Sequence, residues 1–313
     1  MIRISILFLS LFLFFACSKE KRSDKKGKKM KTFIKNISSK AKGKNSDFIV
    51  IPQNGIELVY NDYDAESGID YNYLNAIDGV GIEELFYNDG EVEADERLET
   101  LKLVKNEVKV MVADFVNSDN ERTLAINKNL DNGFICYPRV GNNYDYEYIT
   151  TPIINENSND VNGLSDAQNY IYMISYNQYS SKQQVINALR NTNYDVVLME
   201  LFFDTDVSFS NAEIAQLKTK ANGGKRKVIS YMNIGAAESY RYYWKDNWKL
   251  HHPRWLKKPY DGYEDEIWVK FWKNDWKNII YKEDNSYLDK IIDAGFDGVY
   301  LDNIEAYYFL YFD

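Results

Sequence analysis

The stretch "GFDGVYLDNIEAYYFLYFD" (residues 295–313) decides the fold that we predict for this chain of 313 residues. Its apolar run, residues 298–301, has the composition of a buried strand and leads directly to Asp302. A helical pattern over residues 287–296 precedes the run and stops at Gly295, which is typical of a helix C terminus. A helix that leads into a buried strand is the repeating unit of a parallel α/β sheet.

The same unit recurs along the chain. Helical patterns such as residues 180–192 and 210–221 lie between further apolar runs. These runs are residues 48–54, 79–87, 108–114, 170–178, 194–200, 227–233 and 267–270. Together with residues 297–303 they predict a single (β/α)8 barrel over residues 45–313, with residues 133–140 as a candidate for a short extra strand.

Polar residues end nearly every predicted strand. In a barrel of this kind the C-terminal ends of the strands form the rim of the active site. The residues are Asn54, Glu83, Asp114, Gln178, Glu200, Asn233, Lys270 and Asp302. A single one of them is best explained as a strand end that meets water, but the whole set predicts a site for a polyhydroxylated ligand.

The N-terminal residues differ from the rest of the chain. Residues 1–17 begin with one Arg, continue as a run of Leu, Ile and Phe, and end in Ala16 and Cys17, which is the pattern of a secretory signal. A cysteine after a small residue resembles the lipobox of bacterial lipoproteins. We therefore predict an exported protein of the cell membrane or outer membrane, anchored through a lipidated Cys17; an ordinary signal peptide that contains a cysteine is the alternative.

Residues 18–44 hold twelve Lys and Arg against two acidic residues, which predicts a flexible, disordered tether. Because the whole chain carries a formal net charge of −9, the part after the tether is strongly acidic. An acidic domain does not neutralise phosphates, so we expect no nucleic acid as a partner. A neutral or cationic ligand fits this charge better.

Histidine and cysteine are too scarce for most kinds of catalysis. The only histidines are His251 and His252, and the only cysteine besides Cys17 is Cys136. A Ser-His-Asp triad, a Cys-His pair or a zinc site would need that one His-His step, which reads as a loop before a proline. We therefore expect no metal and no cofactor, and any catalysis would fall to carboxylates.

Four motifs carry a resemblance to a known family. They are "VISYMNIGAAESYRYYW" (228–244), "PRWL" (253–256), "WVKFW" (268–272) and "AGFDGVYLDNIEAY" (294–307). With them, the segment 170–308 resembles glycoside hydrolase family 114, the endo-α-1,4-polygalactosaminidases and their relatives. The resemblance implies a (β/α)8 barrel and a hydrolase that cleaves a polysaccharide containing amino sugars.

The order of the strands differs from that of the family. In the family, the strand that matches residues 170–178 comes first and the Gly-Val-Tyr-Leu-Asp strand comes fifth. Its last three strands match residues 48–55, 79–87 and 108–116, which here come first. The resemblance thus implies a circular permutation in which residues 117–169 join the old ends, and it predicts that residues 48–54 pair in parallel with residues 297–303.

The resemblance also implies roles for single residues. Asp302 and Glu83 match the catalytic acids of the family, and we predict Asp302 as nucleophile and Glu83 as general acid/base of a retaining hydrolysis. Glu84 is the rival of Glu83, because the register of a strand is not fixed by its sequence. The alternative for Asp302 is that it only hydrogen-bonds a loop. The substrate-binding candidates are Asn54, Glu84, Asp114, Gln178, Glu200, Asn233, Glu238 and Tyr300.

Three departures from the family pattern keep other functions open. Gly-Glu-Ala-Glu of the family is Gly-Ala-Ala-Glu at 235–238, Ile-Asp-Tyr is Met-Glu-Leu at 199–201, and Trp-Asp-Pro is Trp-Lys-Asn at 272–274. The alternative to an enzyme is therefore a lipoprotein that binds a glycan or a host molecule on the same barrel without turnover. A structural lipoprotein with no sugar site is the third reading.

Overall fold

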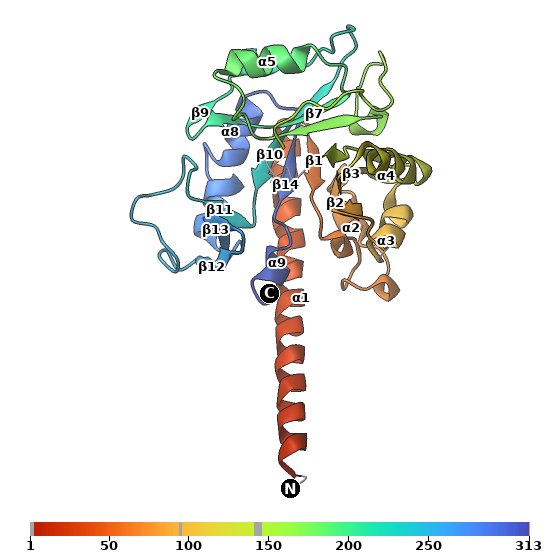
Figure 1. Cartoon of the computed structure of the whole chain (residues 1–313). Helices are drawn as coiled ribbons and strands as arrows, with labels where there is room; N and C mark the ends of the chain where they lie inside the picture. The colour runs from red at the N-terminus through yellow and green to blue at the C-terminus, as the bar shows by residue number, and fades with distance from the viewer. Residues whose placement is uncertain (1–2, 94–95, 141–145, 313) are drawn as a thin grey trace.

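The computed structural model describes residues 3–93, 96–140 and 146–312, with side chains from residue 21 onward except at Val140. The chain forms a mixed α/β structure built on parallel sheets (Figure 1). The α-helices are α1 (Arg3–Lys44), α2 (Tyr71–Leu74), α3 (Glu96–Val104), α4 (Asp119–Asp131), α5 (Lys182–Arg190), α6 (Asn211–Ala215), α7 (Asn274–Lys277), α8 (Tyr287–Asp293) and α9 (Ala306–Phe309). Short 3-10 turns η1 (Ile56–Val59), η2 (Ala65–Ser67) and η3 (Leu164–Asp166) and one π-helical turn, η4 (Asn278–Lys282), complete the helical elements.

The main sheet has five parallel strands in the order β1-β14-β10-β7-β6. They are β1 (Ile49–Pro52), β14 (Gly298–Asp302), β10 (Lys227–Asn233), β7 (Val196–Glu200) and β6 (Tyr170–Met173). β1, from the beginning of the chain, lies beside β14, from its end, with Val50 opposite Val299 (Figure 1). This confirms the predicted pairing of residues 48–54 with residues 297–303.

The second sheet continues the first. Its parallel strands are β2 (Gly79–Asn88), β3 (Lys109–Val116) and β4 (Ile135–Cys136), and β5 (Arg139–Val140) also pairs with β3. A parallel bridge between Gln53 and Gly81 links β1 to β2. Within the described residues no ladder joins β4 back to β6, so the parallel sheets do not close into a hydrogen-bonded barrel.

The apolar run at residues 267–270 is not a barrel strand, in contrast to the prediction. It lies at the end of β13 (Tyr263–Val269), which pairs antiparallel with β12 (Leu256–Tyr260) and β11 (Ala236–Glu238). A tight turn at Gly262, with φ of 87°, closes the β12–β13 hairpin. β10 therefore pairs directly with β14, and β4 supplies a parallel strand where the prediction had only a candidate. A second small hairpin joins β8 (Phe202–Asp204) and β9 (Val207–Ser208).

The predicted helices before the strands are present. α6, within the helical pattern predicted over residues 210–221, begins at a capping box in which Ser210 and Glu213 satisfy each other's backbone N–H groups. α8 begins at a similar box, formed by Ser286 and Asp289, and the chain leaves it at Gly295 with φ of 84°. These two ends fix where β14 starts, and so where Asp302 comes to lie.

Residues 21–44 are folded, which corrects the predicted tether. They belong to α1, and Met30, Phe33, Ile34 and Ile37 on one side of that helix are fully buried. Their spacing of three and four residues is that of an amphipathic helix, a pattern that the high count of lysines conceals. The ring of Phe33 stacks on that of Phe271, with 6.1 Å between the centroids.

The N-terminal part of α1 includes Cys17, the residue of the predicted anchor. Among the residues that were described with their side chains, no helix combines the length and the apolar character needed to cross a membrane. The side chain of Cys17 lies outside this described part.

Candidate functional site

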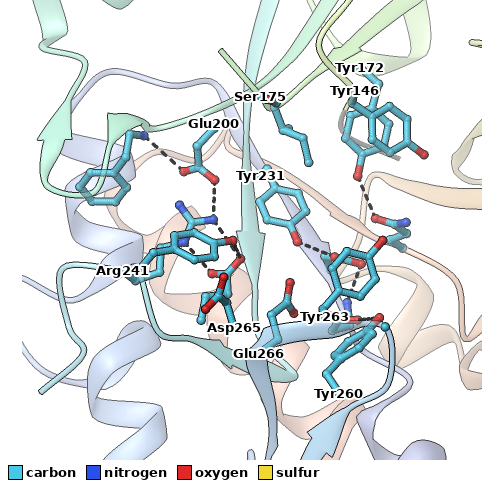
Figure 2. A pocket seen from close by; sticks show the side chains of 18 of the residues that line it. Tyr146, Tyr172, Ser175, Glu200, Tyr231, Arg241, Tyr260, Tyr263, Asp265 and Glu266 are labelled. Atoms are coloured by element: carbon cyan, nitrogen blue, oxygen red, sulfur yellow. Dashed lines mark hydrogen bonds and ion pairs between the residues drawn. The ribbon is translucent and has the colours of Figure 1, made fainter. Parts of the chain in front are cut away.

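A cavity of about 1010 Å³ lies at the edge where β1, β2, β7, β10 and β14 end (Figure 2). Polar residues that follow parallel strands meet at one such edge, which is where ligands bind in α/β folds. The β12–β13 hairpin and α9 complete the wall through Tyr260, Tyr263 and Phe309. The cavity combines carboxyl groups with exposed aromatic rings.

Asp302 is the last residue of β14 and lines this cavity. Its Oδ2 accepts a hydrogen bond from Tyr231 Oη at 2.5 Å, and its Oδ1 accepts one from the backbone N–H of Asn303 at 2.7 Å. Burial, together with the negative charge of Glu83, raises the pKa of Asp302 to about 7 in spite of these bonds. At neutral pH the carboxyl group is therefore present in both its protonated and its ionised form.

Glu83 comes from β2 and lines the same cavity. Its backbone N–H donates to Asn54 Oδ1 at 3.1 Å, and its carboxylate accepts a hydrogen bond from the hydroxyl of Tyr146. Arg139 Nη2 lies 4.0 Å from Glu83 Oε1, and the ring of Tyr146 stacks on that of Tyr172 with 3.8 Å between centroids. These contacts hold the carboxylate against the wall.

An irregularity in β2 separates the positions of Glu83 and Glu84. After Glu83 the regular pairing of β2 with β3 is interrupted, and Glu84 takes a positive φ of 55°. Its carboxylate lies 3.6 Å from Arg139 Nη2, and its carbonyl accepts a hydrogen bond from Arg97 at 3.0 Å. In the described part of the chain, the cavity wall includes Glu83 and not Glu84.

Two further carboxyl groups line the cavity. Burial and then the charge of Glu57 raise the pKa of Glu305 to about 8, while Asn54 donates a hydrogen bond to its carboxyl group. Burial and then the charge of Glu238 raise the pKa of Glu266 to about 8. Both groups are therefore largely protonated at neutral pH and are able to donate hydrogen bonds.

On the opposite wall, Arg241 forms ion pairs with two carboxylates (Figure 2). Arg241 Nη2 lies 2.8 Å from Glu200 Oε2, and its Nε lies 2.6 Å from Glu238 Oε2. Tyr287 donates to Glu200 at 3.0 Å and Tyr240 to Glu238 at 2.8 Å. Burial alone would lower the pKa of Arg241, but the two carboxylates raise it well above its ordinary value, so the guanidinium stays charged.

The structure brings half of the ten predicted site residues to the cavity. Those that line it are Asn54, Glu83, Glu200, Glu238 and Asp302. They come from both ends of the chain, which the pairing of β1 with β14 places together. Glu84, Asp114, Gln178, Asn233 and Tyr300 do not line it.

Asp114 and Asn233 have structural roles in place of the predicted contact with a ligand. The carboxylate of Asp114, which is fully buried, accepts hydrogen bonds from the backbone N–H groups of Phe86 and Tyr87 at 2.8 and 3.2 Å. Asn233 Oδ1 accepts one from the backbone of Ala236 at 2.8 Å. Asp114 thus fixes the irregular end of β2, and Asn233 fixes the turn between β10 and β11, because buried backbone donors need partners.

Tyr300 and Gln178 lie on either side of the predicted rim. Tyr300 is fully buried beneath the cavity, and its ring meets that of Tyr172 edge-on at 5.4 Å. It fills the space beside Gly81, where an added Cβ would lie 1.9 Å from Tyr300 Oη. Gln178 is exposed, because β6 ends at Met173 and the chain turns before it reaches that residue.

Sequence reasoning missed several residues of the wall. Arg241 stands inside one of the quoted motifs, and Tyr231 lies two residues before Asn233 on β10, so a period of two would have placed Tyr231 on the same face. Tyr146 follows no pattern, because it belongs to an irregular segment. In the described residues no cluster of three or more His, Cys, Asp or Glu is arranged to hold a metal ion.

Comparison with known proteins gives a family for the second half of the chain. Residues 156–310 match the family model described as glycoside-hydrolase family GH114. The matched part runs from β6 to β14 and includes Asp302, Glu200, Glu238 and Arg241. This part of the chain is therefore similar to a family of glycoside hydrolases.

Curated relatives share shorter segments. An uncharacterised protein of Thermotoga maritima is 44% identical over 79 residues, which cover 25% of this chain and 23% of the relative. Uncharacterised proteins of Methanocaldococcus jannaschii and Deinococcus radiodurans are 37% and 35% identical over 131 and 125 residues, or 41% and 40% of this chain. The chain spans only 36% and 38% of those two relatives' length.

Proposed function

We propose that the protein hydrolyses an amino-sugar polysaccharide of the polygalactosamine type, with Asp302 and Glu83 as the catalytic carboxyl groups. The observation that carries the proposal is that both line one cavity, close enough for the charge of Glu83 to raise the pKa of Asp302. They approach from β14 and β2, on either side of β1. The exposed acidic side chains of Asp204, Glu264 and Asp265, which also line the cavity, favour a substrate with ammonium groups.

The proposed reaction retains the configuration of the sugar. The pair reacts with one proton in place: Asp302 in its ionised form attacks the anomeric carbon and forms a glycosyl ester, while Glu83 in its protonated form gives that proton to the departing glycosidic oxygen. Glu83 then takes a proton from the water that breaks the ester. The hydrogen bonds from Tyr231 and from the backbone of Asn303 favour the ionised Asp302 that the first step needs.

The test is incubation of the protein with polygalactosamine and with chitosan-like polymers, followed by mass spectrometry of the products. Asp302→Asn and Glu83→Gln should each lower kcat by about 10²–10⁴-fold. Asp131→Asn and Glu107→Gln, at exposed positions, serve as matched controls and should leave it unchanged. Near-normal turnover by either cavity variant in its folded state would remove that residue from the mechanism.

A glycan-binding protein without turnover is the second candidate. It is favoured by the contact of the Tyr146 hydroxyl with Glu83 and by Ala236, which replaces a family carboxylate. Calorimetric titration with the same oligosaccharides separates the two candidates. Binding by the wild type with no product after long incubation would favour this one.

We also propose that the parallel sheets derive from a circularly permuted (β/α)8 barrel. The strand order β6-β7-β10-β14-β1-β2-β3-β4 supports this. The rings of Tyr137 and Tyr170, which lie near the two free edges of this series of strands, support it too, because their centroids are 5.9 Å apart. The test is a chain that starts at residue 146 and joins residue 313 to residue 21 through a Gly-Ser linker. It should fold and keep the activity of the wild type; an unfolded product would contradict the proposal.

For the location of the protein we propose export and anchoring through a lipidated Cys17. The support is the sequence of residues 1–17. Cys17→Ala should move the protein from the membrane fraction to the soluble fraction. Its retention in the membrane fraction would mean that lipidation of this cysteine is not the anchor.

A further inference from the structure

A group of lysines stands out on this acidic protein. Lys26 and Lys29 of α1 lie over the ring of Trp272, with 3.6 and 5.9 Å from each Nζ to the ring centroid. Further lysines lie around them. We call the whole group the basic ridge, and it consists of Lys25, Lys26, Lys29, Lys257, Lys270 and Lys273.

The charges of the basic ridge are close together and are not compensated. Partial burial and then Lys29, Lys25, Lys273 and Lys270 lower the pKa of Lys26 to about 8. In the part of the chain that the structure describes, none of the ridge lysines forms an ion pair with a carboxylate. Like charges held close together without ionic partners repel one another and raise the free energy of the folded protein. Binding to an anionic surface would lower this free energy again.

The basic ridge and the cavity wall are joined by one hairpin. Lys257, in β12, and Lys270, just after β13, lie at the open end of the β12–β13 hairpin, whose turn end carries Tyr260 and Tyr263 of the cavity wall. The beginning of the described part of α1 contacts α9, where Ser23 Oγ donates to the carbonyl of Tyr307 at 3.2 Å. Figure 1 shows α1 extending beyond the body of the protein on the side where α9 lies.

We propose that the basic ridge binds the anionic headgroups of a phospholipid membrane, so that the cavity lies next to that membrane. The occupant rests on the proposed anchor, because a lipidated Cys17 lies on the same helix just before the ridge and would hold the ridge at a membrane surface. Lysines next to a membrane anchor are attracted to anionic lipids. Trp272, which is half-buried among these lysines, is of the kind that settles at a membrane interface.

The ridge also changes what α1 does. Because α1 is packed on the core from residue 30 to residue 41, the protein is not free to turn about a flexible linker. The ridge and the helix together therefore hold one orientation of the cavity. A substrate would have to reach it in the layer next to the membrane surface.

The experiment measures vesicle binding by the full chain carrying Cys17→Ser, so that no attached lipid contributes. Vesicles of phosphatidylcholine alone are compared with vesicles that also contain phosphatidylglycerol. Binding should be tighter to the anionic vesicles, and Lys26→Gln with Lys273→Gln should reduce this preference by about fivefold for each lysine, since one lysine near such a surface contributes about 1 kcal/mol. Lys105→Gln with Lys225→Gln, both exposed and outside the ridge, should leave the preference unchanged.

A second measurement reports contact without changing a charge. Lipids brominated near the headgroup should quench the tryptophan fluorescence of the wild type more than that of Trp272→Phe. Equal affinity for both kinds of vesicle, or equal loss of preference in the ridge and control variants, would overturn the proposal. So would binding to soluble dextran sulfate that depends on the ridge without any preference for anionic vesicles, because it would assign the ridge to a soluble polyanion.

Discussion

The two walls of the cavity hold their carboxyl groups in opposite ways. On one wall, Arg241 lies between Glu200 and Glu238 and pairs with both. On the other wall, Asp302 and Glu305 accept hydrogen bonds from uncharged groups, and their pKa values rise to about 7 and about 8, chiefly through burial. Burial is common to both walls and raises the pKa of Glu200 too, so the walls differ in the arginine that fixes the carboxyl groups of one of them.

This difference separates structure from chemistry within one cavity. A carboxylate paired with a buried arginine is fixed in its place by the ion pair, although burial still raises the pKa of Glu200. A buried carboxyl group without such a partner titrates near neutral pH, where a proton can be given or taken. In the proposed function we therefore expect the wall with Asp302 to react, and the wall with Arg241 to keep the shape of the cavity.

The largest effect is expected from removing the cation. Arg241→Met should lower the free energy of unfolding by about 3–5 kcal/mol, because Glu200 and Glu238 would remain buried without compensation. The loss should shrink as the pH falls, since protonation removes the uncompensated charges. Denaturant unfolding at several pH values measures both effects, with Arg190→Met on the surface as control. A loss of less than about 1 kcal/mol would mean that Arg241 does not stabilise the carboxyl groups of this wall.

The next effect concerns Asp302 and the pH dependence of stability. Its pKa in the folded state, about 7, lies above the ordinary value of 3.8, so the folded protein binds a proton that the unfolded chain has lost. Stability from this group is therefore present at low pH and is lost as the pH rises through about 7. The slope should reach about 1.4 kcal/mol per pH unit and flatten in Asp302→Asn. An equal slope in the variant would assign the titration to another group.

A smaller shift is expected in the pH profile of activity. If Asp302 is the nucleophile, kcat/KM rises with pH through its pKa of about 7. Tyr231→Phe removes a hydrogen bond that favours the ionised form, and it should move this limb upward by about one to two pH units. Activity that falls as the pH rises through the same range would instead give Asp302 the role of general acid.

The smallest effect is expected for Tyr240, which donates to a carboxyl group on the wall with Arg241 as Tyr231 does on the wall with Asp302. Tyr240→Phe removes a hydrogen bond to Glu238, but Arg241 still holds that carboxylate. The free energy of unfolding should fall by about 0.5–1.5 kcal/mol, and the pH profile should not move. A shift of the profile as large as that of Tyr231→Phe would mean that the two walls are not distinct.

Much of the fold follows from apolar runs, and the exceptions have clear physical reasons. Buried parallel strands are continuous apolar runs, so β14, β10, β7 and β3 were predicted close to their places. A run of four residues such as 267–270 does not tell a parallel strand from the buried end of an antiparallel hairpin. In residues 21–44 the charge count outweighed a stripe of four apolar residues, although only the stripe meets the core.

The sequence predicted only part of the site, because a strand pattern describes only the local course of the chain. A strand end fixes where a polar residue lies along the sheet, but not whether it turns to the cavity or to a backbone amide. Asp302 turns to the cavity, whereas Asp114, at a similar strand end, binds the backbone of Phe86. The interruption of β2 after Glu83 and the contact of Tyr146 with it depend on distant segments, which no local pattern reveals.

The close fit of Gly81 to Tyr300 has a consequence for evolution. The two residues belong to strands from opposite halves of the chain, and the hydroxyl of the tyrosine occupies the place that any side chain at position 81 would need. A side chain at position 81 therefore requires a smaller residue at position 300. Among homologous proteins we expect coupled substitution, in which a side chain at the position of Gly81 occurs together with a residue smaller than tyrosine at that of Tyr300.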